Sequence, residues 1–147
     1  MQSLRWLATL LLVALVLGCG AGGKPPAIPV KGKVMFKKDT PAAGAMIVFH
    51  PLSEEFERRI GGKPFAKVQE DGSFQLTTYQ ENDGAPEGEY GLSVDWRVKP
   101  KNFLVFDSES SATGKQMLKD KYTNPQKPFL KVTVKKGEAN DFLIEVD

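Results

Sequence analysis

Acidic side chains gather in one short stretch of this chain and are the first candidates for chemistry. Four carboxylates fall within nine residues, in and just before "DGAPEGEY" (83–90): Glu81, Asp83, Glu87 and Glu89. Oxygen ligands at this density suggest Ca²⁺, but an EF-hand loop needs a D-x-[DN]-x-[DN]-G pattern and a distant Glu. Asp, Asn, Gly and Pro are also turn formers whose side chains bond the local backbone. The spacing therefore favours a corner over a metal site.

The same stretch predicts how that corner is built. Pro86 fixes its own φ angle, and Gly88 permits backbone conformations that other residues resist. Tyr90 then begins a strongly alternating segment. We expect the Tyr90 hydroxyl to bond back to nearby backbone, as in the tyrosine corner of Greek-key sandwiches.

Catalytic chemistry finds little support in the residue types present. His50 is the single histidine, and it stands at the end of an apolar run directly before Pro51. A zinc site needs several ligands, and a nucleophile needs a base beside it. We interpret His50 as a strand-end residue with ordinary hydrogen bonds. The sequence predicts no catalytic residue, no metal and no cofactor.

The only cysteine gives the most specific motif. Residues 7–17 are apolar except for Thr9, too short a run to span a bilayer, and "VLGCG" follows. This end resembles the bacterial lipobox, which implies cleavage between Gly18 and Cys19 and a diacylglycerol on the Cys19 sulfur. Two or more acyl chains hold a protein firmly on a membrane. The alternative is an ordinary cleaved signal with a chance cysteine nearby.

The lipobox resemblance sets the expected organisation and location. Residues 1–18 would be a lipoprotein signal peptide, 19–29 a lipidated Gly/Pro tether, and 30–147 one domain. The protein would be lipid-anchored in a bacterial cell envelope, on the periplasmic face or at the outer membrane or cell surface. Its 20 Lys and Arg nearly balance its 18 Asp and Glu, which gives no electrostatic argument for nucleic acid.

The domain itself shows the period of strands. Apolar residues alternate with polar ones after residue 29 and again over 89–98, where Tyr90, Leu92, Val94, Trp96 and Val98 share one face. Gly91, Ser93, Asp95 and Arg97 fall on the other face, and we expect Trp96 in the core. Further strands are expected at 45–50, at 65–69 and 73–79 around an Asp71-Gly72 turn, and in a closing hairpin over 129–146.

Helix is expected in only two places. One turn should start at Ser53, and a short helix within the irregular segment 100–127 should cover 113–121, capped by Ser110 or Ser111. About seven short strands with regular turns predict an all-β, antiparallel β-sandwich with a long loop before the last hairpin.

Several motifs also carry a family resemblance. "VKGKVMFKKDTPAAGAMIVFHP", "DGSFQL" and "APEGEY" together resemble carboxypeptidase-regulatory-like domains, the transthyretin-like sandwich; the matching positions are Val30, Gly32, Val34, Pro41, Gly44 and Ala45. The resemblance implies a seven-stranded Greek-key sandwich that serves as an accessory or adhesive module. Enzymes on related sandwiches, such as hydroxyisourate hydrolases and intradiol dioxygenases, need several histidines, and this chain has one.

A partner surface is expected around the apolar run "NFLVF" (102–106), which lies among charged residues. It either packs under the long loop as a satellite cluster or forms a contact patch. The candidate contact residues are Arg97, Lys99, Phe103 and Phe106. The sequence therefore favours a non-catalytic envelope module, structural or adhesive through protein or glycan contacts. A small-ligand carrier is the alternative, and an enzyme a distant third.

Overall fold

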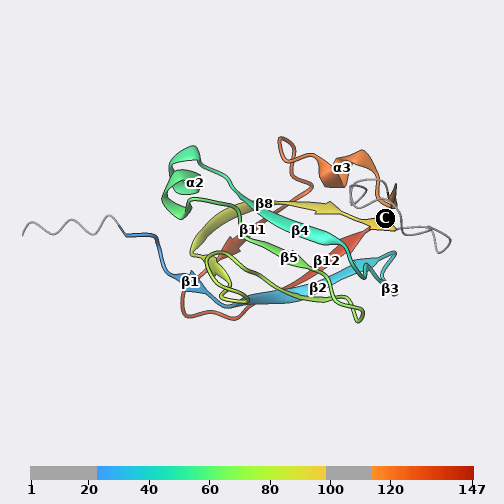
Figure 1. Cartoon of the computed structure of the whole chain (residues 1–147), viewed down its shortest axis with the longest axis horizontal. Coiled ribbons are helices and arrows are strands. Elements are labelled where there is room, and N and C mark those ends of the chain that lie inside the picture. The colour runs from blue at the N-terminus through green and yellow to red at the C-terminus, as the bar shows by residue number, and fades with distance from the viewer. Residues whose placement is uncertain (1–22, 99–113) are drawn as a thin grey trace, which may run out of the picture.

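The computed structural model describes residues 23–98 and 114–147. They form two packed β-sheets with helices at the margins (Figure 1). The predicted all-β sandwich is confirmed at this level. The expected signal peptide, the cleavage pair Gly18 and Cys19, and the candidate contacts Lys99, Phe103 and Phe106 lie outside the described residues.

The first sheet is antiparallel throughout. Its strands run in the order β11, β8, β4, β5, with bounds Leu130–Val134, Gly88–Asp95, Met46–Pro51 and Phe65–Lys67. Its longest pairing joins β4 and β8 over six residue pairs, from Met46↔Asp95 to Pro51↔Tyr90. Ile47 and Phe49 of β4, with Leu92 of β8, point inward and are fully buried.

The second sheet corrects the predicted antiparallel arrangement. It contains β12 (Asn140–Val146), β2 (Val30–Phe36) and β3 (Thr40–Pro41), and β6 (Ser73–Gln75) also pairs with β2. β12 runs parallel to β2 over seven residue pairs. The expected closing hairpin is therefore wrong, because β11 and β12 belong to different sheets. Apolar alternation marks both strands but does not identify the partner of either.

Two short ribbons complete the described strands. β1 (Ala27–Ile28) pairs with β7 (Ala85–Pro86), and β9 (Arg97–Val98) pairs with β10 (Lys115–Gln116). β1 comes from the segment 19–29 that the sequence assigns to a tether, and it pairs with a strand of the domain. The Tyr79 hydroxyl also donates to the Pro25 carbonyl at 3.0 Å.

Helix α2 (Glu54–Ile60) starts where the sequence predicts it. Its N-cap is Ser53, whose Oγ accepts the Phe56 N–H at 3.1 Å, and its C-cap Gly61 is left-handed with φ 75°. The helix is longer than the single turn expected. None of the helices within the described residues is long and apolar enough to cross a membrane.

Helix α3 (Asp120–Thr123) corrects the helix expected over 113–121. Lys115 and Gln116 pair with β9, so a helix cannot start there, and the Gln116 carboxamide oxygen accepts the Trp96 N–H. The N-cap is Lys119, with no side-chain cap; Ser110 and Ser111 lie outside the described residues.

The core lies between the two sheets and is rich in aromatic rings. Phe49 lies 6.4, 5.8 and 6.1 Å, centroid to centroid, from the rings of Phe74, Tyr90 and Phe142. Trp96 is 8% exposed, as predicted, and its indole N–H donates to the Ala43 carbonyl at 2.9 Å.

The second face of β8 is also covered at two positions. Gly91 and Ser93 are buried. A Cβ on Gly91 would lie 2.6 Å from Pro128, because the segment after α3 packs onto this face. This contact shows why a glycine occupies position 91 of an otherwise regular strand.

Candidate functional site

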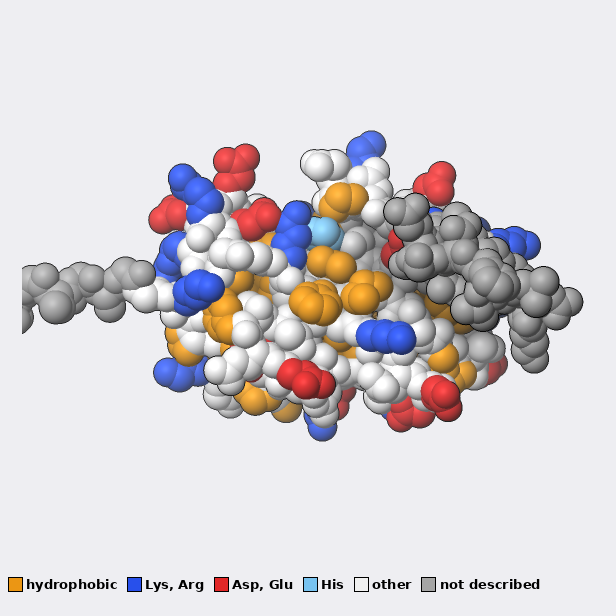
Figure 2. All heavy atoms as spheres, in the orientation of Figure 1, with side chains coloured by type: hydrophobic (Ala, Val, Ile, Leu, Met, Phe, Trp, Pro, Cys, Tyr) orange, Lys and Arg blue, Asp and Glu red, His pale blue; other side chains and the backbone are white. Residues whose placement is uncertain are grey.

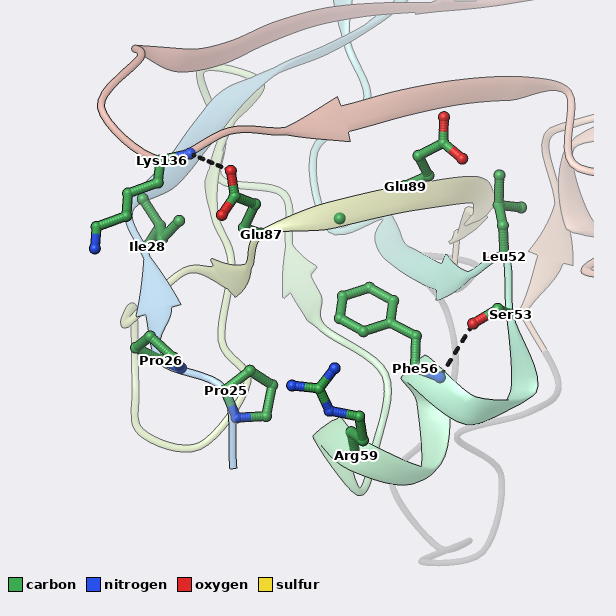
Figure 3. A pocket seen from close by; sticks show the side chains of 11 residues that line it. Pro25, Pro26, Ile28, Leu52, Ser53, Phe56, Arg59, Glu87, Glu89 and Lys136 are labelled. Carbon is green, nitrogen blue, oxygen red and sulfur yellow. Dashed lines mark hydrogen bonds between the residues drawn. The ribbon is translucent and has the colours of Figure 1, made fainter. Parts of the chain in front are cut away.

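The main candidate site is a surface groove at the end of the sandwich where the chain enters from the N-terminal side. It has a volume of about 580 Å³, within the range of small-molecule sites (~300–1,000 Å³). Helix α2, the segment before β1 and the β7–β8 corner enclose it (Figure 3). We call it the tether-end groove; it is lined by Pro25, Pro26, Ile28, Leu52, Ser53, Phe56, Arg59, Glu87, Gly88, Glu89 and Lys136.

Helix α2 supplies the central side chains, and its sequence explains its stability. Glu54, Glu55 and Glu57 stand in its first turn, with Arg58 and Arg59 in its last, which complements the helix dipole. The Phe56 ring packs 5.5 Å from the Tyr90 ring, centroid to centroid, and so fixes the helix on the corner.

Gly88 lets this helix approach the corner closely. A Cβ at position 88 would lie 2.4 Å from Cε1 of Phe56, closer than real Cβ contacts. Any other residue would therefore displace the ring that forms the groove wall. Gly88, which the sequence predicts as a turn residue, thus also leaves the space that the Phe56 ring occupies.

Both acidic and basic side chains line the groove, and not all of them form ion pairs with other described residues. Arg59 is exposed, and Figure 3 shows its guanidinium pointing into the space between Pro25 and Phe56. Within the described residues, Arg59 has no hydrogen bond or ion pair. Glu87 accepts the backbone N–H of Lys136 at 3.2 Å. A guanidinium beside apolar and aromatic walls can bind a carboxylate carried by an apolar group.

The acidic stretch before the corner is structural at Asp83. Its carboxylate accepts the backbone N–H groups of Thr78, Tyr79 and Gln80 at 2.7, 3.0 and 3.0 Å. This confirms the interpretation of Asp83 as a turn residue. Within residues 23–98 and 114–147, no three His, Cys, Asp or Glu side chains come close enough to hold a metal ion.

His50 lies outside the groove, on the outer face of β4. Its Nε2 is hydrogen-bonded to Ser93 Oγ at 2.7 Å, which confirms the ordinary hydrogen bond expected of it. Burial, and secondarily the charge of Lys63, lower the pKa of His50 below its usual range. The imidazole is thus held neutral and bonded to a strand neighbour.

Of the four residues predicted to contact a partner, only Arg97 is among the described residues. This residue is exposed on β9, and its Nε lies 3.1 Å from a carboxylate oxygen of Asp95. The other candidate contacts, Lys99, Phe103 and Phe106, lie outside the described residues. The tether-end groove was missed because separate segments of the chain supply its walls, and no sequence period links them.

Comparisons with known proteins identify no relative. No family model, no curated protein and no solved structure matches this chain. The transthyretin-like resemblance therefore stays a prediction, and the function has to be inferred from the surfaces of the molecule.

Proposed function

We propose that this chain is a lipid-anchored, non-catalytic module of a bacterial cell envelope that holds a partner at its surface. Its role is structural or adhesive contact with an envelope protein or glycan, and the tether-end groove is the contact site. Arg59 favours a partner that presents a carboxylate beside an apolar group.

The packing of the core is the observation that carries this proposal over the carrier alternative. A carrier of this fold would need space between its sheets. Here Phe49 and its three aromatic neighbours occupy that space. Recognition is then left to the outer surface, where the tether-end groove lies.

The length of the chain before the groove supports the anchoring role. Six residue steps separate Cys19 from Pro25, which lines the groove. A fully extended chain of that length spans roughly 20 Å at ~3.3–3.6 Å per residue. A lipid on Cys19 would thus keep the groove close to the membrane surface.

For the fold, we propose the seven-stranded Greek-key, transthyretin-like topology. The motifs from Val30 to Ala45 and around "DGSFQL" support it, as does the hydrogen bond that the Tyr90 hydroxyl donates to the Pro86 carbonyl at 2.7 Å. The parallel pairing of β2 with β12 is a local departure from an antiparallel arrangement.

Replacing Cys19 by serine tests the anchor. We expect the wild-type chain to sediment with membranes and to carry the added mass of a diacylglycerol. The Cys19→Ser variant should lack that mass and move to the soluble fraction, because serine offers no thiol to alkylate. Absence of the diacylglycerol mass from the wild-type chain would contradict lipid anchoring.

A photo-activated cross-linking residue at position 59 tests the contact site. In cells of the source bacterium, we expect discrete higher-mass adducts from position 59. Position 33, an exposed lysine on β2 of the other sheet, serves as the matched control. Equal adducts from both positions, or none from either, would show that the groove is not the contact surface.

A further inference from the structure

A second hollow lies between β5 and β6. The two strands meet at a bridge between Phe65 and Thr77, and again at the turn where Gln69 N–H donates to the Ser73 carbonyl at 2.8 Å. Between these points they diverge, because β5 pairs with β4 and β6 with β2. The resulting hollow has a volume of about 620 Å³.

Three aromatic residues, Phe65, Phe74 and Tyr79, and several carboxamides line this β5–β6 hollow. Phe65 is 44% exposed, unusually open for a phenylalanine. Gln75, Gln80 and Asn82 line the hollow and are exposed. Within the described residues, no hydrogen bond involves the carboxamide group of any of the three. Figure 2 shows hydrophobic side chains gathered over β4 and β5, beside the histidine.

These groups match the chemistry of a sugar ring. Each carboxamide places an N–H donor beside a carbonyl acceptor, and neighbouring sugar hydroxyls offer the same pair. The apolar C–H face of a sugar can lie on an aromatic ring, whose faces carry partial negative charge. Lys67 and Glu81 are charged, but neutral groups outnumber them in the polar lining, which suits an uncharged ligand.

We propose that the β5–β6 hollow binds a neutral oligosaccharide. Phe65 lies under one sugar ring, and Gln75, Gln80 and Asn82 bond its hydroxyls. The site is separate from the tether-end groove and requires neither Arg59 nor the lipid on Cys19. Sugar binding at this hollow can therefore be confirmed or contradicted independently of the proposed lipid anchor and of the proposed contact at the tether-end groove.

Calorimetric titration of the full chain in detergent with maltotetraose, cellotetraose and chitotetraose tests the site. We expect at least one of these sugars to bind with a Kd on the order of 1 mM. Phe65→Ala should weaken that binding about tenfold, because the stacking surface is lost. Leu143→Ala is the matched control, since Leu143 is 66% exposed on β12 of the other sheet.

A second variant separates recognition from folding. Gln80→Leu keeps the volume of an exposed side chain but removes its donor and acceptor, so it should also weaken binding while thermal unfolding stays unchanged. Binding of none of the three sugars overturns the proposal. So does a Phe65→Ala loss matched by Leu143→Ala, or a Gln80→Leu variant that binds like the wild type.

Discussion

Replacing Gly84 by alanine should destabilise the protein by at least about 4 kcal/mol, among the largest effects of single substitutions. A Cβ there would lie 1.8 Å from the Ile28 carbonyl oxygen and 2.8 Å from Pro29 Cα, and φ is +95°. The backbone has no room to shift, because Gly84 N–H donates to the Leu76 carbonyl and Gly84 O accepts the Thr78 hydroxyl. Urea denaturation measures the change.

Gly44→Ala is the matched control for this result. Gly44 also has a positive φ, +80°, but nothing lies within 4 Å of a Cβ built there. Its substitution should cost only the left-handed strain of alanine, about 1–2 kcal/mol. If the two variants lose equal stability, the close approach of Gly84 to Ile28 does not constrain the fold.

The Gly84 contact also connects stability to the candidate site. It holds Ile28 of β1 against the turn that leads into β7. Ile28 lines the tether-end groove, and Pro25 is held nearby by the Tyr79 hydroxyl. A variant that released β1 would therefore lose one wall of the groove before the core unfolded.

Local sequence signals predicted the parts of the fold that depend on local physics. Ser53 caps α2, and Asp71 and Gly72 form the expected turn, in which Gly72 has a φ of +83°. The alternation over 89–98 correctly placed Tyr90 and Trp96 in the core. Each of these features follows from a few neighbouring residues.

Pairing over long distances could not be predicted in the same way. β12 shows the same apolar alternation whether it pairs antiparallel with β11 or parallel with β2. Gln116 lies in a helix-compatible stretch, yet its carboxamide is used by Trp96, 20 residues earlier. Tertiary contacts decided both cases, because local preferences are weak beside packing.

The candidate site was still harder to foresee. The acids that drew attention are partly used by the backbone, as at Asp83. The groove depends instead on Phe56 and Arg59, which the sequence shows only as ordinary members of a charged helix. Gly88 was a usable signal, although the sequence did not show that an aromatic ring fills the space it leaves.

Replacing Tyr90 by phenylalanine should cost about 1–3 kcal/mol of stability, the usual cost of leaving a buried polar group without its partner. The Tyr90 hydroxyl donates to the Pro86 carbonyl at 2.7 Å, and both residues are buried. The predicted hydrogen bond from the Tyr90 hydroxyl back to nearby backbone is thus confirmed. Removing the hydroxyl leaves the ring packing on Phe49 and Phe56 in place but takes its hydrogen bond from the carbonyl.

Tyr79→Phe provides the matched control, because its hydroxyl makes the same type of bond, to Pro25 at 3.0 Å, at a less buried position. It should lose less stability; an equal loss would contradict the role of burial.

Burial raises the pKa of Tyr90. The stability that the neutral Tyr90 side chain contributes is therefore fully present below the pKa of an unfolded tyrosine, about 10. It is lost as pH rises above that value. Urea midpoints measured across this range should fall with pH less steeply in Tyr90→Phe than in the wild type, because the variant has no phenol there to ionise.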